Sequence, residues 1–212
     1  MLAPMKTQYD KSGPTLVKAM KKRQFDAYYC STAEEAVEKV LELIPEGDVV
    51  SWGGVATVGQ LGIKDRLRQR NQPLIDRDTA KTPDERMDML RQALTCDTFL
   101  MSSNAISTDG QLVNIDGMAN RVAALCFGPK QVIVVAGMNK VAGDLNAAIA
   151  RARNVAAPAN AQRFNIKTPC AVNGQCGDCT SPDCICAQMV ITRFSKIKGL
   201  IKVVLVGEDL GL

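Results

Sequence analysis

Apolar and polar positions along the chain predict strands and helices in alternation. Short runs rich in Val, Ile, Phe or Trp, flanked by turn residues, have the length and composition of strands. The predicted strands are residues 26–30, 48–52, 73–76, 98–102, 131–136, 188–193 and 202–206. The run at residues 131–136 is apolar throughout and is typical of a strand buried on both faces. Asp109-Gly110 stands between two extended segments and predicts a hairpin turn.

Between the strands, apolar residues recur with the period of an α-helix. Thr32 and Thr82 each stand three residues before a glutamate, which is the capping-box pattern of a helix start. Asp144 caps a later helix, which Pro158 is expected to stop. Further helices are predicted at residues 14–24, 57–70 and 120–127.

Strands that alternate with helices indicate an α/β fold built on a mostly parallel, Rossmann-like sheet with helices on both faces. The chain has 212 residues and no long linker, so a single domain over residues 1–212 is expected. Residues 1–24 form its helical lead, and residues 166–190 form a cysteine-rich loop.

Composition narrows the possible functions. The chain is 46% hydrophobic and 23% charged, with a net charge of +4 spread along its length, so nothing indicates nucleic-acid binding. No apolar run reaches membrane-spanning length and no secretory signal is evident, which favours a cytoplasmic protein. Histidine is absent, which excludes Ser-His and Cys-His nucleophile pairs and histidine metal ligands.

Cysteines are concentrated near the C-terminus. Five of the eight lie between residues 170 and 186, in the stretch TPCAVNGQCGDCTSPDCIC. Gly, Asn, Asp, Ser and Pro make tight turns there, so several thiolates can converge on one point. Thiolates at this density suit zinc or an iron–sulfur cluster, while paired disulfides and inert free thiols are the alternatives.

The Cys-x2-Cys pair, Cys176 and Cys179, is the core of this candidate metal site. Cys170 and one of Cys184 or Cys186 would complete four ligands. These last two cysteines lie two positions apart and share one face of an extended segment, so geometry does not choose between them. The spacing matches neither the usual ferredoxin run nor a two-knuckle zinc ribbon, and the identity of the metal stays open.

A second candidate site begins at the glycine turn that follows the strand at residues 48–52. Gly53 and Gly54 let the backbone approach a ligand closely, and Ser51 and Thr57 add hydroxyl groups. Ligands of open α/β sheets bind at the carboxyl ends of strands, so an anion is expected here. The alternative is a turn that merely needs small residues.

The polar segment from residue 102 to residue 121 extends this candidate site. Its candidate ligand-binding groups are Asn104, Asp109, Asn114, Asp116, Asn120 and Arg121, although Asp and Asn also serve turns. Asp116 and Arg121 together suit a carboxylate substrate. Lys140 follows the strand at residues 131–136 and points to the same rim. Without histidine, Asp116 or Lys140 is the expected proton carrier of an enzyme.

Several of these segments together resemble the LUD-domain family, named for lactate utilisation. The segments that carry the resemblance are residues 51–57, 62–63, 104–116, 120–124 and 128–140. The resemblance covers roughly residues 15 to 210 and implies a fold like that of the sugar-phosphate isomerase and coenzyme A transferase group. In that group the glycine turn after a strand binds anionic parts of substrates.

The chain is similar to the small, free-standing type of LUD protein that ends in a cysteine-rich segment. That resemblance implies Cys170, Cys176, Cys179 and Cys186 as the ligands, and Cys184 stands where an arginine is expected. The larger iron–sulfur subunits of lactate-oxidising complexes carry a ferredoxin-like domain with repeated cysteine motifs, which this chain lacks. Family resemblance therefore does not imply lactate oxidation.

Three hypotheses follow. The first is a protein of lactate or related organic-acid metabolism that binds a small anion and an iron–sulfur cluster, with 4Fe-4S preferred over zinc. The second is an isomerase or transferase acting on a phosphorylated sugar or acyl-coenzyme A, with structural zinc. The third is a redox-sensing protein whose cysteines cycle. The expected partners are the small anion, a redox protein and a further copy of the chain.

Overall fold

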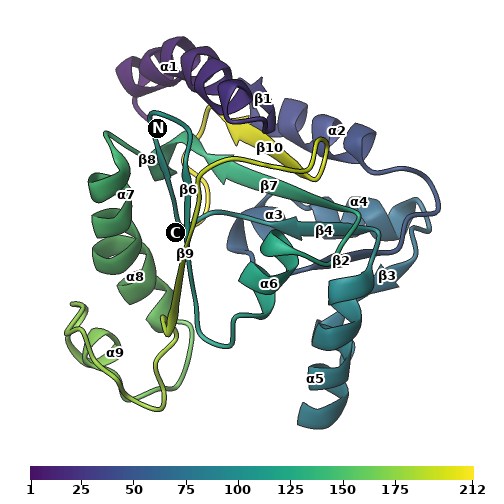
Figure 1. The fold of residues 1–212 in the computed structure, drawn as a ribbon, viewed down its shortest axis with the longest axis vertical. Helices are drawn as coiled ribbons and strands as arrows, with labels where there is room; N and C mark the ends of the chain where they lie inside the picture. Colours follow the sequence, from purple (N-terminus) through teal and green to yellow (C-terminus); the bar gives the residue numbers. More distant parts are fainter.

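The computed structural model describes residues 1–212, which form two β-sheets with helices around them (Figure 1). The larger sheet has six strands in the order β1-β10-β7-β4-β2-β3, and all neighbouring strands are parallel. Its strands are β1 (Asp26–Cys30), β2 (Val50–Trp52), β3 (Leu74–Ile75), β4 (Thr98–Met101), β7 (Gln131–Gly137) and β10 (Ile201–Val206). The predicted α/β fold with a parallel sheet is confirmed.

The central strand β7 shows why the molecule is layered. Val132 and Val134 pack into one hydrophobic cluster, whereas Ile133 and Val135 pack into another on the opposite face. Alternate residues of a strand point to opposite faces, so both faces of this sheet are covered. One face is covered by α2 (Ala33–Leu43), α3 (Ala56–Gln60) and α4 (Ile63–Gln69). The other is covered by α1 (Ala3–Lys22), α6 (Asn120–Cys126) and part of the second sheet.

The second sheet is smaller and has the strand order β8-β5-β6-β9. Its strands are β8 (Val141–Ala142), β5 (Ala105–Ser107), β6 (Leu112–Asp116) and β9 (Gln188–Thr192). Strands β5 and β6 form the hairpin predicted at Asp109-Gly110, where Gly110 has a φ of 91°. Strand β9 joins this sheet antiparallel to β6, so the segment after the cysteine loop does not extend the parallel sheet.

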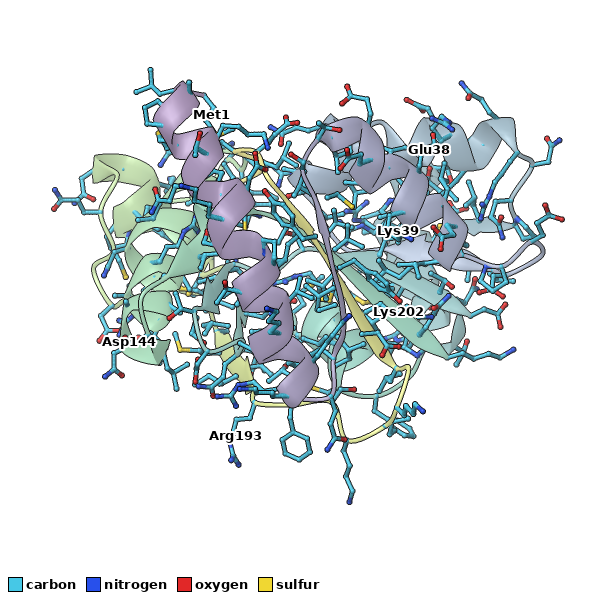
Figure 2. All side chains as sticks on the ribbon, turned by 90° about the horizontal axis from the view of Figure 1, so that it is seen from above. Met1, Glu38, Lys39, Asp144, Arg193 and Lys202 are labelled. Carbon is cyan, nitrogen blue, oxygen red and sulfur yellow. The ribbon has the colours of Figure 1, made fainter.

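The N-terminal helix is longer than predicted. The expected start at residue 14 is wrong, because α1 runs from Ala3 to Lys22 with Pro14 inside it. Figure 2 shows this helix from above, running across the molecule. Gly13 lies against the ring of Tyr29, where a Cβ atom would come within 2.2 Å of ring carbons. The helix therefore packs closely on β1 at the residue before its proline.

The helix capped by Asp144 also continues further than predicted. It comprises α7 (Leu145–Arg151), a π-helical turn η4 (Ala152–Ala156) and α8 (Ala157–Ala161). The expectation that Pro158 stops the helix is wrong. Pro158 lies in the first turn of α8, after the π-helical turn, where its missing N–H is tolerated.

Local sequence signals located two helix starts correctly, but they missed a break in a third helix. Thr32 and Thr82 accept hydrogen bonds from the amides of Glu35 and Glu85, at 3.2 and 3.1 Å, so both predicted caps are confirmed. The single helix expected at residues 57–70 is instead divided into α3 and α4, because Gly62 adopts a left-handed φ of 65° between them. None of the helices is long and apolar enough to cross a membrane.

Candidate functional site

A cleft of about 520 Å³ opens at the carboxyl ends of β2, β4 and β7, between the parallel sheet and the second sheet. This edge of an open α/β sheet is the usual place for a ligand. We call this space the anion cleft. Most of the predicted ligand-binding and catalytic residues line it, namely Gly53, Gly54, Thr57, Asn104, Asp116, Asn120, Arg121 and Lys140. Ser51 does not, because its hydroxyl donates to the carbonyl of Ile75 at 2.9 Å.

The two glycines of the turn make room for arginine side chains. A Cβ atom on Gly53 would lie 2.9 Å from Cδ of Arg121, and one on Gly54 would lie 2.9 Å from Nη2 of Arg77. The amide of Gly53 donates to the carbonyl of Leu100 at 3.1 Å. The following helix, α3, is a single short turn and adds little dipole. Positive charge at this turn therefore comes mainly from the arginines.

Arg121 is fully engaged within the protein. Its guanidinium donates four hydrogen bonds, to the carbonyls of Ser102 and Ile115 and to the side-chain oxygens of Asn104 and Asn114, at 2.6–3.0 Å. Its Nε lies 3.5 Å from a carboxylate oxygen of Asp116. Burial lowers the pKa of Arg121, and Asp116 opposes that shift. Arg121 thus ties β4 and β6 to α6 and contributes charge to the cleft without offering a free donor pair.

Arg77 is a residue of the anion cleft that sequence reasoning missed. It begins η1 (Arg77–Thr79), which follows the short edge strand β3. Its guanidinium donates no hydrogen bond to the protein, its buried Nε lacks a partner, and the nearest carboxylate, Asp78, lies 3.8 Å away. Burial, and next the charge of Arg86, lowers the pKa of Arg77. Its place just after a strand was the signal available, but β3 has only two residues.

Lys140 ends η3 (Met138–Lys140), directly after β7, and the residue is only 4% exposed. The amine donates to the hydroxyls of Ser102, at 3.0 Å, and Thr57, at 3.3 Å, and forms no salt bridge. Burial, followed by the charges of Arg151 and Arg121, lowers the pKa of Lys140 to about 7. An amine with that pKa is substantially uncharged at neutral pH, so it can accept a proton or attack an electrophile.

The C-terminal residues complete the wall around this amine. A Cβ atom on Gly211 would lie 2.4 Å from Oγ1 of Thr57 and 2.8 Å from Nζ of Lys140. Gly211 also has a left-handed φ of 66°, and its amide donates to Gln60 at 2.7 Å. Only glycine fits at this position without strain. The segment that passes over Lys140 therefore shields the amine from bulk water.

The cysteine-rich loop forms a second, much smaller cavity, which we call the thiol cavity. All five cysteines between residues 170 and 186 line it. Every cysteine in the chain is a free thiol. No group of three or more Cys, Asp or Glu side chains is drawn together closely enough to hold a metal as the loop stands. The predicted ligands thus line one cavity, but their sulfur atoms are not arranged around a common metal position.

Cys184 and Cys186 are the most closely associated of these thiols. Their sulfur atoms lie 3.2 Å apart. Burial, the hydrogen bond with Cys184 and the neighbouring Cys176 and Cys179 together raise the pKa of Cys186 to about 12. The first residues of α8, which follow the π-helical turn, also line the thiol cavity. The turn that admits Pro158 therefore helps to build this cavity.

The two cavities share a wall. Ile185 lines both, and a Cβ atom on Gly117 would lie 3.3 Å from the Cα atom of Ile185. Gly117 follows Asp116 at the end of β6, so the thiol loop packs backbone to backbone beside the carboxylate of the anion cleft.

The family model described as LUD domain matches residues 14–206. The chain belongs to the LUD-domain family. A similar solved structure is a DUF162 family protein from Deinococcus radiodurans, with a TM-score of 0.52 and 12% identity, covering 93% of this chain and 98% of that one. None of the curated proteins matches the chain.

Two further solved structures are more distant. The eIF2B delta protein of Chaetomium thermophilum has a TM-score of 0.34 and 17% identity, covering 52% of this chain and 48% of that one. The eIF2B-beta2-delta2 complex of the same organism has a TM-score of 0.40 and 17% identity, covering 84% of this chain and 56% of that one. Likeness at this level adds nothing to the function of the cleft.

Proposed function

We propose that this LUD-domain protein binds a small organic anion in the anion cleft and acts in lactate or related organic-acid metabolism. The observation that carries the proposal is Arg77, a largely buried guanidinium beside the Gly53-Gly54 turn that donates no hydrogen bond within the protein. Its one ion pair, with Asp78 at 3.8 Å, is long, and Asp78 is shared with Lys64 and Arg86. Buried charges are normally paired, so an arginine left without a hydrogen-bond acceptor inside a cleft favours an anionic ligand.

The charge of the whole cleft supports the same conclusion. Its basic residues are Lys64, Arg77, Arg86, Arg121, Lys140 and Arg163, whereas its acidic residues are Asp78 and Asp116. Asp78 already accepts from Lys64 at 3.0 Å, and Asp116 lies beside Arg121. The net positive field therefore remains for a ligand. A charge-assisted hydrogen bond to Arg77 would contribute about 1.5–3 kcal/mol, or roughly tenfold to a hundredfold in affinity.

The test is a binding panel measured by isothermal titration calorimetry and thermal shift. The panel comprises L-lactate, pyruvate, inorganic phosphate, ribose 5-phosphate and coenzyme A. We expect at least one anion to bind, and Arg77→Met to weaken its binding tenfold or more. Arg91→Met is the matched control, because Arg91 is 70% exposed on α5 (Pro83–Gln92), outside the cleft. If no anion binds, or if both variants bind equally well, the proposal is wrong.

We further propose that the thiol loop holds a metal centre, with Cys170, Cys176, Cys179 and Cys186 as ligands. The donor set supports this, because five thiols without a disulfide line one cavity. The number of thiolates favours an iron–sulfur cluster, with 4Fe-4S first, which would supply one-electron chemistry beside the anion cleft. The thiol cavity has a volume of about 20 Å³, which is closer to the size of a single zinc ion than to that of a cluster. Binding of a cluster would therefore require the loop to open.

Anaerobic purification with analysis of iron, sulfide and zinc separates these centres. Matching iron and sulfide identify a cluster, and about one zinc per chain identifies a structural metal site. The double variant Cys176→Ser, Cys179→Ser is expected to lose the metal. Cys126→Ser is the control, because Cys126 is an exposed thiol outside the loop. Full metal content in the double variant would contradict the proposal.

A second candidate function is an isomerase or transferase that acts on a phosphorylated sugar or an acyl-coenzyme A. Lys140 favours it, because a buried amine beside two hydroxyls can carry a proton at neutral pH. Asp116 is the other candidate, since its Oδ2 atom is buried without a hydrogen bond. A sugar phosphate or coenzyme A ligand in the panel, rather than lactate or pyruvate, would favour this function.

The cellular setting is part of the proposal. Free thiols throughout the chain support a reducing compartment, and we infer the cytoplasm. An iron–sulfur centre would need a redox protein as electron partner. Size-exclusion chromatography with light scattering tests whether the chain also associates with a second copy. Reversible oxidation of the thiol loop would instead support a redox-sensing role.

A further inference from the structure

Lys140 is an unusual lysine for a structural role. Lysine is almost never fully buried without an acidic partner, and this one has only the hydroxyls of Ser102 and Thr57. The carboxylate of Asp116, which lines the same cleft, is paired with Arg121 at 3.5 Å and not with the amine of Lys140. Lys140 nevertheless lines the anion cleft, so its amine faces the space where a ligand is expected.

The groups around the amine oppose its protonation. Its side chain is buried, and the two charged groups that shift its pKa, Arg151 of α7 and Arg121 of α6, are both cationic. Both factors lower the pKa of Lys140, to about 7. The segment at Gly211 covers the amine and limits access of water. A desolvated, substantially neutral amine beside a ligand cleft is the arrangement required of an amine nucleophile.

We propose that Lys140 forms an imine with a small anionic carbonyl compound held in the anion cleft. The inference rests on the proposed anion site, because Arg77 beside the Gly53-Gly54 turn would hold the carboxylate or phosphate of that compound. The carbonyl group would then be presented to the amine. Two sources share this chemistry, a 2-oxo acid and an open-chain sugar phosphate.

The reaction balances without a further reactant. The nitrogen lone pair forms a bond to the carbonyl carbon, and the carbonyl oxygen takes up a proton, which gives a carbinolamine. Loss of the hydroxyl group as water then leaves a carbon–nitrogen double bond. The hydroxyl of Ser102, 3.0 Å from the amine and 3.4 Å from that of Thr57, is placed to pass the protons between nitrogen and oxygen.

The test is reductive trapping of the intact protein. Pyruvate and ribose 5-phosphate, in separate arms, are incubated with the protein and sodium borohydride, which reduces an imine to a stable secondary amine. Peptide mass spectrometry then locates the adduct. We expect modification of Lys140 above all other lysines, at least tenfold above the level with acetone, which lacks an anionic group. The arm that labels identifies the source of the ligand.

Variants sharpen the result. Lys140→Arg and Lys140→Met are expected to lose the adduct, whereas Lys130→Met keeps it, because Lys130 is exposed and lies outside the cleft. Site mapping on the unaltered protein gives the answer even if a variant folds poorly. Adducts spread evenly over surface lysines, or equal labelling in Lys140→Arg, overturn the inference.

Calorimetry on the same compounds separates this inference from the proposed function. Binding that depends on Arg77, together with no adduct on Lys140, overturns imine formation and leaves the anion site intact. Neither binding nor an adduct overturns both. Labelling is also expected to increase severalfold from pH 6 to pH 8, as the amine loses its proton, and labelling that is independent of pH over this range contradicts the inference.

Discussion

Replacement of Lys140 by methionine tests the electrostatics of the cleft through protein stability. The methionine side chain has a similar length and no charge, so it removes the cost of burying an ammonium group. Burial and the charges of Arg151 and Arg121 lower the pKa of Lys140 from 10.5 to about 7. Since one pKa unit corresponds to about 1.4 kcal/mol, the buried ammonium costs on the order of 5 kcal/mol below the folded-state pKa.

The sign of the pH dependence follows from proton binding. Between the folded pKa and the unfolded pKa of 10.5, the unfolded chain holds a proton on Lys140 that the folded chain lacks. Stability therefore rises with pH in this window, and the penalty is greatest below the folded pKa, where Lys140 is charged in both states. From about pH 6 to about pH 9 the wild-type protein should gain roughly 2–3 kcal/mol relative to Lys140→Met.

The assay is urea unfolding of both proteins at several pH values in that range, with a reductant to keep the thiols free. Subtracting the unfolding free energy of one protein from that of the other at each pH removes the contributions of all other titrating groups. Lys64→Met provides the control, because Lys64 is paired with Asp78 at 3.0 Å and its removal deletes a favourable contact. If the difference in unfolding free energy between wild type and Lys140→Met does not change with pH, the amine is not desolvated as the structure indicates.

Three further substitutions test particular contacts by thermal or urea unfolding. Gly13→Ala would ordinarily favour a helix, but a Cβ atom 2.2 Å from the Tyr29 ring should make it destabilising by about 1–3 kcal/mol. A stabilised Gly13→Ala would show that α1 packs less closely. Gly211→Ala forces a left-handed φ and a clash with Lys140, and should lose about 1–3 kcal/mol and weaken anion binding; unchanged binding would argue against this wall of the cleft. Arg121→Met deletes four hydrogen bonds and should lower the free energy of unfolding by about 3–5 kcal/mol. A decrease below about 1 kcal/mol would show that these hydrogen bonds do not hold the segments together.

The sequence located much of the candidate site because the site follows a simple rule of α/β sheets. The strands at 48–52, 98–102 and 131–136 are recognisable from their composition, and the residues after parallel strands meet at one edge. The amino-acid pattern is therefore enough to bring the glycine turn and Lys140 together. Arg77 follows the same rule, but its two-residue strand gives almost no pattern. Its lack of a hydrogen-bond partner is a property of the folded packing alone.

The features that can be predicted from the sequence are local or periodic. The capping boxes at Thr32 and Thr82, the hairpin at Asp109-Gly110 and the parallel α/β order arise from interactions within a few residues, or from repeated burial of one face. The dense cysteines also identified the thiol loop. These features are encoded in short segments, so they can be read without knowing where distant segments lie.

The tertiary structure alone decided the features that depend on contacts between distant segments. The π-helical turn that precedes Pro158, the second sheet completed by β9, and the hydrogen bonds of Arg121 to distant segments arise from such contacts. The pKa of Lys140 depends on burial by the segment at Gly211 and on two arginines from other helices. Desolvation and charge are summed over all neighbours in space, and the sequence does not state which neighbours those are.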